Sequence, residues 1–139
     1  MSDDLLTIGE LARRAGVPTS TVRYYERRGL LIPDARRSGQ RRYRDTSLRR
    51  LVFIGLMQDA GLSLDDIAGV LAADSVADWK QIGRRRLTAL DDQLASLQRA
   101  RAYLAGALRC RHAHPLTECP VMGTEIERRL TSAPRAPTP

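Results

Sequence analysis

The 139-residue sequence predicts an all-α protein with a small β wing, in which a compact head precedes one long helix. Three observations support this fold class. Two short amphipathic segments flank a Gly-Val-Pro break at residues 16–18, and an arginine-rich polar stretch surrounds Gly39. After Asp74, leucines recur at the spacing of a coiled-coil seam.

The composition indicates a folded chain whose N-terminal third is basic. Apolar residues make up 42% and charged residues 28%, and the formal net charge is +7. Residues 1–50 contain twelve arginines but only six acidic residues, which indicates a polyanionic partner. No apolar run approaches the roughly 18 residues of a membrane span, and no signal-peptide pattern opens the chain. We therefore expect a cytoplasmic protein without a membrane partner.

The first thirty residues predict two helices joined by a tight turn. Thr7 can cap the first helix, and Glu10, three residues later, can return a hydrogen bond. A second helix begins at Thr19 or Ser20 and ends at Gly29. One apolar stripe on the first helix follows helical spacing: Ile8, Leu11, Ala12 and Ala15.

Residues 34–44 predict a short hairpin, and two more helices follow it. Gly39 lies among polar residues that suit a hairpin turn, and Asp45 is the expected N-cap of a third helix that runs to Gly61. Ser63 caps a fourth, whose apolar face carries Leu64, Ile67, Val70 and Leu71. Residues 1–74 therefore predict a winged helix-turn-helix DNA-binding domain.

Residues 75–109 predict a dimerisation helix. At about 1.5 Å per residue it is about 45 Å long, more than a head of this size can cover, and a helix with one apolar seam is unstable alone. We therefore expect a homodimer. Residues 110–130 form a sensor loop and a short helix at about 121–130, and residues 131–139 a disordered tail. The seam consists of Leu87, Leu90, Leu94, Leu97, Leu104 and Leu108.

The candidate DNA contacts lie on the second helix and on the wing. Arg23 suits guanine or phosphate, whereas hydroxyl groups near the helix N-terminus suit phosphate. Tyr25 shares a face with Val22 and fits the core as well as it fits a contact. The proposed contacts are Thr19, Ser20, Thr21, Arg23 and Tyr24 on the helix, with Arg36, Arg37, Arg41, Arg42 and Tyr43 on the wing.

The sequence contains one candidate metal or redox site, which consists of Cys110, His112, His114 and Cys119. If the chain is extended after the helix, the first three project from one side, and Cys119 can complete four N/S ligands. Such a set suits Zn²⁺ or another thiophilic metal. If the helix continues to His114 instead, only Cys110 and His114 share a face.

Four segments follow one another along the chain: Ile8-Gly9-Glu10-Leu11-Ala12, Val22-Arg23-Tyr24-Tyr25-Glu26, Gly29-Leu30-Leu31 and Arg41-Arg42-Tyr43. In their order and intervals they resemble the MerR family of regulators. The match covers residues 5–110. It implies a dimer held by an antiparallel coiled coil, bound to an inverted repeat within an overlong promoter spacer. Effector binding would then distort the DNA and realign the promoter for RNA polymerase, an indirect partner.

Within that family, residues 38–43 and 78–82 resemble the SoxR branch, whose members carry four cysteines for a [2Fe–2S] cluster. Cys110 and Cys119 match two of those positions, but Ala107 and His112 occupy the others, so we expect no standard cluster. Copper- and zinc-sensing branches also use a two-cysteine loop, which keeps Zn²⁺ and Cu⁺ as candidates. Divalent sensors add a cysteine from the start of the partner's long helix, and residues 75–77 contain none.

The residues leave the effector open between a metal or metalloid, a thiol–disulfide signal, an organic ligand, and a loop that is inert or holds structural zinc. An alternative class is a metal-binding structural protein whose basic surface contacts acidic partners without promoter preference. A thiol oxidoreductase is disfavoured because the sequence has no Cys-x-x-Cys pair and no βαβ pattern. We expect no enzymatic activity.

Overall fold

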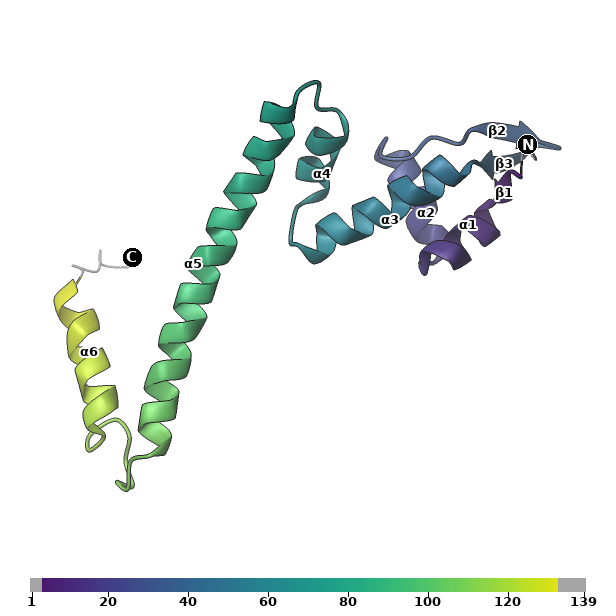
Figure 1. Cartoon of the computed structure of the whole chain (residues 1–139). Coiled ribbons are helices and arrows are strands. Elements are labelled where there is room, and N and C mark those ends of the chain that lie inside the picture. Colours follow the sequence, from purple (N-terminus) through teal and green to yellow (C-terminus); the bar gives the residue numbers. More distant parts are fainter. Residues whose placement is uncertain (1–3, 133–139) are drawn as a thin grey trace, which may run out of the picture. The chain divides into compact units, whose positions relative to one another are not determined.

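The computed structural model describes residues 4–132 and confirms the predicted fold class. Helices dominate, and one small antiparallel sheet lies near the N-terminus (Figure 1). The chain divides into two compact units between Arg86 and Leu87. The elements are β1 (Leu6–Thr7), α1 (Ile8–Ala15), α2 (Thr19–Arg27), β2 (Ala35–Arg37), β3 (Gln40–Tyr43), α3 (Asp45–Asp59), α4 (Leu64–Leu71), α5 (Val76–Leu108) and α6 (Pro120–Ser132).

The helix-turn-helix forms as its capping residues predict. Thr7 Oγ1 accepts the Glu10 N–H at 3.2 Å, and Gly16 ends α1 in the left-handed conformation that glycine adopts without strain. The inward face of α2 carries Val22 and Tyr25, both buried. The Tyr25 hydroxyl donates to Gln58 Oε1 at 2.7 Å, so Tyr25 belongs to the core.

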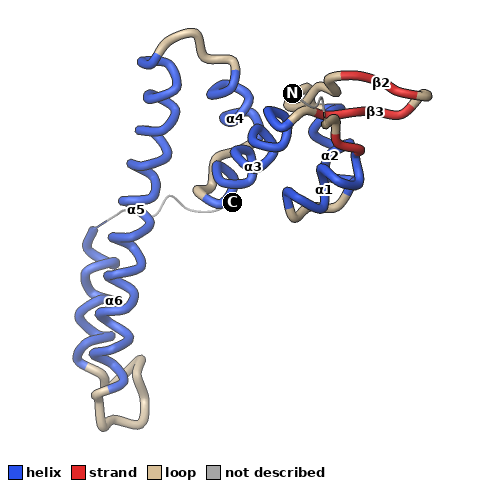
Figure 2. The backbone as a smooth tube through the Cα atoms, turned by 45° about the vertical axis from the view of Figure 1, so that its right-hand side comes forward, coloured by secondary structure: helices blue, strands red, loops and turns tan. Residues whose placement is uncertain are grey.

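The wing is a three-stranded sheet in the order β1-β3-β2, as Figure 2 shows for the hairpin. Ser38 and Gly39 both have positive φ, 54° and 76°, which suits a two-residue hairpin turn. The sequence did not predict β1, which pairs with β3 and sets Leu6 opposite Tyr43. Because β1 leads directly into α1, this pairing attaches the wing to the first helix.

The start of α3 differs from the prediction. Arg44, and not Asp45, occupies the N-cap position, and its side chain makes no capping hydrogen bond. Asp34 supplies the cap from the loop before the wing: its Oδ2 accepts both the Arg44 N–H and the Ser47 hydroxyl at 2.8 Å. A carboxylate also suits the positive end of the helix dipole, so this single acid connects the entry of the wing to its exit.

One apolar core joins the elements of the head. α1 and α2 contribute Leu11 and Val22, β3 contributes Tyr43, and α3 and α4 contribute Ile54 and Ile67; each of these side chains is fully buried. α5 extends this core at its first turns, where Ile82 packs against it. The core thus holds α2, the wing and the start of α5 in one unit.

Arg86 closes the C-terminal end of α3. Its Nε donates to the Ala60 carbonyl at 2.7 Å, and no basic residue lies in the last turn of α3 itself. A cation at this end pairs with otherwise unsatisfied carbonyls and with the negative end of the dipole. Gly61 has a φ of 84°, and a Cβ at that position would overlap the Arg86 guanidinium. The site therefore requires glycine.

The second unit contains most of α5, a loop and α6. No residue of α5 is buried, and five of the six seam leucines are at least half exposed, up to 85% for Leu108. At the end of the helix, a Cβ on Gly106 would lie 3.1 Å from Val121 Cγ1, so α6 approaches α5 closely there. Within residues 4–132, no helix is both long enough and apolar enough to cross a bilayer.

The C-terminal helix is longer than the sequence predicted. It begins at Pro120 and includes Thr131 and Ser132, which we had expected in the tail. Two hydrogen bonds from the Thr131 hydroxyl, to the Glu127 and Arg128 carbonyls, accompany this extra turn. The rest of the predicted disordered tail, residues 133–139, lies outside the described residues.

We predict that Arg86→Ala lowers the free energy of unfolding by about 1–2 kcal/mol, because a partly buried carbonyl loses a charged donor. Urea denaturation at a fixed protein concentration measures the change. Arg85→Ala is the matched control, since Arg85 is exposed on the same helix. Equal midpoints for the two variants would contradict this role of Arg86.

Candidate nucleic-acid interface and thiol site

The outer face of α2 presents the residues predicted to contact DNA. Ser20 and Arg23 are exposed, and Thr19 and Thr21 are half-buried near the N-terminus of the helix. Tyr24 is 40% exposed, and its hydroxyl accepts a hydrogen bond from Arg28 Nη1 at 3.2 Å. This face therefore offers hydroxyl groups and cations together, which are the groups that bind phosphate and base edges.

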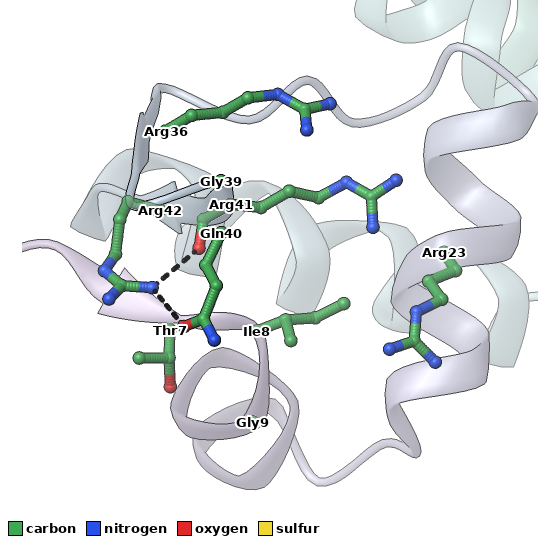
Figure 3. A pocket seen from close by; sticks show the side chains of 9 residues that line it. All are labelled: Thr7, Ile8, Gly9, Arg23, Arg36, Gly39, Gln40, Arg41 and Arg42. Atoms are coloured by element: carbon green, nitrogen blue, oxygen red, sulfur yellow. Dashed lines mark hydrogen bonds between the residues drawn. The ribbon is translucent and has the colours of Figure 1, made fainter.

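A pocket of about 580 Å³ lies between α2, the wing and the start of α1 (Figure 3). The guanidinium groups of Arg36 and Arg41 extend from the hairpin towards α2, where Arg23 faces the same space. Four arginines and no acid line the pocket, which makes its field positive, although Glu26 outside the lining offsets part of the charge of Arg41. The lining consists of Thr7, Ile8, Gly9, Arg23, Arg36, Gly39, Gln40, Arg41 and Arg42.

The strand register assigns the wing arginines to different faces. Arg36 pairs directly with Arg41 across β2 and β3, so their side chains leave the same face of the sheet. Arg42 leaves the opposite face together with Gln40, and its Nη1 donates to Gln40 Oε1 at 3.4 Å. The hairpin therefore has two basic faces, of which the Arg36–Arg41 face is turned towards α2.

Tyr43 requires a correction to the predicted contact set. It is fully buried, and its hydroxyl donates to Glu26 Oε1 on α2, so it is part of the core and has no surface to offer DNA. Glu26, which the sequence reasoning did not select, also pairs with Arg41 through Oε2 and Nε at 3.1 Å. The sequence held only part of this signal: Arg41 and Tyr43 are two residues apart on a strand and hence share a face, but nothing local identifies Glu26 as their common partner.

The environment of Tyr43 perturbs its ionisation. Burial above all, then the hydrogen bond and the negative charge of Glu26, raise the pKa of the Tyr43 phenol well above its usual value near 10. Arg41 and Arg23 act in the opposite direction but do not offset these causes. The phenol therefore remains a donor at any physiological pH, and the contact between β3 and α2 persists.

The two cysteines come together beside the N-terminus of α6. Cys119 is buried, and the Cys110 thiol is close enough to lower the pKa of Cys119. The backbone N–H of Met122, followed by the Val121 N–H and the Cys110 thiol, lowers the pKa of Cys119, while burial acts against them. A sulfur at a helix N-terminus with these donors is a thiolate ligand or nucleophile at lower pH than a free thiol.

The histidines are not gathered with the cysteines. α5 ends at Leu108, so the loop is not helical through His114, yet within residues 4–132 no three His, Cys, Asp or Glu side chains are close enough to share a metal ion. His112 is exposed, and its Nδ1 lies 3.9 Å from Glu118 Oε2. Among the described residues, the site therefore offers the chemistry of a two-sulfur pair.

A helix-turn-helix, a basic hairpin beside it and a separate long helix define a DNA-binding protein of the winged helix-turn-helix class. Two family models match the chain: "MerR HTH family regulatory protein" over residues 6–74 and "MerR, DNA binding" over residues 48–107. The chain belongs to the MerR family of transcriptional regulators, which are not enzymes.

Three similar proteins illustrate the range of this family. A SoxR homologue from Chromobacterium violaceum, named as a transcriptional activator, is 35% identical over 116 residues, with 79% of this chain and 78% of the relative covered. The structure of a MerR regulator from Bacillus megaterium MB1 with mercury(II) matches at a TM-score of 0.57 and 31% identity, covering 87% and 99% of the two chains. HiNmlR, a MerR regulator lacking the sensor domain and bound to promoter DNA, matches at 0.56 and 25%, covering 75% and 83%.

We predict that Tyr43→Phe reduces the loss of folding stability that the wild-type protein shows at alkaline pH. Because the pKa of Tyr43 is raised in the folded state, its contribution is complete below the unfolded pKa of about 10 and is lost as the pH rises beyond it. Denaturation midpoints measured between pH 8 and pH 11 should fall less for Tyr43→Phe than for wild type. Parallel curves for the two proteins would contradict the prediction.

Proposed function

We propose that the chain binds an inverted-repeat promoter as a homodimer and distorts the DNA when an effector binds. The observation that carries this proposal is the pocket in which Arg23 of α2 faces Arg36 and Arg41 of the wing. A recognition helix and a wing on one basic surface can engage a major groove and its flanking phosphates together. The similarity to a regulator bound to promoter DNA supports this assignment.

The proposed contacts are now Thr19, Ser20, Thr21, Arg23 and Tyr24 on α2 and Arg36, Arg37, Arg41 and Arg42 on the wing, with Tyr43 omitted because it is buried.

The homodimer follows from the α5 seam. Leu87, Leu94 and Leu97 are 56–67% exposed, and this much apolar surface on one helix is unfavourable in water without a partner. A second copy presents the same seam, so an antiparallel coiled coil would bury both and supply two heads with two-fold symmetry. Two such heads require two half-sites in inverted orientation. When the effector binds, the dimer would distort the DNA and so realign the promoter for RNA polymerase.

The effector that the loop favours is a thiophilic metal ion. Cys110 and Cys119 supply two adjacent sulfurs, and soft thiolate ligands select ions such as Cu⁺. Zn²⁺ normally takes four protein ligands in structural sites, and His112 and His114 are not gathered with the sulfurs. Between the two candidate ions, the donor set therefore favours Cu⁺. Metal analysis of protein purified without added metal distinguishes copper from zinc, and both from an iron–sulfur cluster.

We predict that Arg23→Ala weakens specific DNA binding by about 1–3 kcal/mol, because an arginine at a base edge or phosphate is lost. Gel-shift titration on an inverted-repeat duplex, selected by the wild-type protein from a random library, measures the effect. Arg99→Ala is the matched control, since it removes an equal charge from α5. Size-exclusion chromatography should find both variants dimeric, and unchanged affinity for Arg23→Ala would refute the recognition-helix assignment.

We predict that Cys110→Ser abolishes the response to the effector while basal DNA binding stays within twofold, since the thiol pair loses one donor outside the DNA-binding unit. Transcription in vitro with and without added Cu⁺ measures the response. Ser96→Ala, an exposed change on α5, serves as control. A fully responsive Cys110→Ser protein would exclude the loop from effector sensing.

A further inference from the structure

We propose that Glu26 is a specificity-determining residue, which restrains Arg41 so that the wing contacts DNA from one fixed position. This inference rests on the proposed function, since it concerns how the same surface discriminates between its operator and other DNA. Glu26 need not touch DNA for this role. It acts through Arg41 and is therefore a positioning residue.

The contacts of Glu26 divide its carboxylate between two partners on β3. Oε2 pairs with Arg41 Nε at 3.1 Å, and Oε1 accepts the hydroxyl of Tyr43. The Glu26 side chain is only 10% exposed, whereas that of Arg41 is 37% exposed. Tyr43 is fully buried and fixes the carboxylate, and the carboxylate in turn fixes one edge of the guanidinium. The outer nitrogens of Arg41 remain directed towards the pocket that Arg23 also faces (Figure 3).

Arg36 provides an internal comparison. It lies directly opposite Arg41 in the hairpin, on the same face of the sheet, and lines the same pocket. Within residues 4–132, the salt bridges include one for Arg41 and none for Arg36. These two arginines carry equal charge on the same face, and only Arg41 is restrained by Glu26; Arg36 is also the more exposed of the two and lies on the edge strand β2.

The ion pair between Glu26 and Arg41 lowers the affinity of the protein for DNA of any sequence. Any duplex offers phosphates to a mobile arginine, and each phosphate neutralised releases counterions irrespective of sequence. A carboxylate beside Arg41 opposes that contact and limits the positions that the guanidinium can reach. Binding to the correct operator loses the least affinity, because the restrained Arg41 already has the position that this operator requires. Discrimination improves when contacts to wrong partners are weakened more than contacts to the right one.

The decisive variant is Glu26→Gln, which removes the negative charge but keeps an oxygen that can accept the Tyr43 hydroxyl. Fluorescence anisotropy compares two duplexes of equal length, an inverted repeat selected by the wild-type protein and a random sequence, across a series of salt concentrations. We expect affinity for the random duplex to rise roughly two- to fivefold, with a salt slope steeper by about one. Affinity for the selected duplex should rise less, so the ratio of the two falls.

Matched controls separate this role from a purely structural one. Tyr43→Phe removes the hydroxyl that holds the Glu26 carboxylate but keeps its negative charge beside Arg41. Its salt slope should therefore stay at the wild-type value, and its discrimination should fall less than that of Glu26→Gln. Arg36→Gln should reduce the random-duplex salt slope by about one, and Arg41→Gln by clearly less, because Glu26 already opposes its charge.

Two results would overturn the proposal: unchanged discrimination in Glu26→Gln, or equal slope losses in Arg36→Gln and Arg41→Gln. If the wild-type protein prefers no selected duplex at all, the proposed function itself fails, which is a different outcome.

Discussion

The burial of Tyr43 against α2 holds α2 and the wing, the two elements that carry the proposed DNA contacts, in one arrangement. β3 has four residues, too few to form a stable sheet alone, and its hairpin partner β2 is almost entirely exposed. What attaches this ribbon is a fully buried ring whose hydroxyl reaches Glu26, together with the pairing of β3 to β1. The distance between the recognition helix and the wing arginines is therefore set from inside the core. A charged surface that must match the spacing of a duplex requires this kind of internal constraint, because surface ion pairs alone hold their geometry weakly.

The head and the long helix differ in how they bury their apolar side chains. In the head, side chains from α1, α2, β3, α3 and α4 bury one another completely. α5 contributes Ile82 and Arg86 to that unit, and beyond Arg86 its leucines have no apolar layer within the described chain. Folding of the head and pairing of the helix are thus separable in physical terms. The proposed binding to an inverted repeat depends on the pairing of the helices, since one head offers the contact surface for a single half-site.

The sequence predicted most of the fold because capping and periodicity are local. Thr7, Gly16 and Ser63 take the capping positions expected of them, and the hairpin turn forms at Gly39. The errors concern contacts between distant residues. Asp34 caps α3 from eleven residues before the start of the helix, and β1 forms only because it pairs with β3. Tyr43 is buried by parts of the chain that are distant in sequence, so the residues next to it do not predict its burial. Glu26 was missed for the same reason, since its partners lie fifteen and seventeen residues away.

In the loop between α5 and α6, the direction of the backbone determines which side chains lie beside the two cysteine sulfurs. Alternation along an extended strand would align Cys110, His112 and His114, but the loop turns again before Cys119, and His112 comes near Glu118 instead. The close approach of Val121 to Gly106 carries the N-terminus of α6 to the end of α5, and so carries the Cys119 sulfur to Cys110. Backbone N–H groups then stabilise negative charge on sulfur without any cationic side chain. If this pair binds the effector as proposed, the softness and the small number of its ligands favour a thiophilic ion over a cation that needs four or more donors.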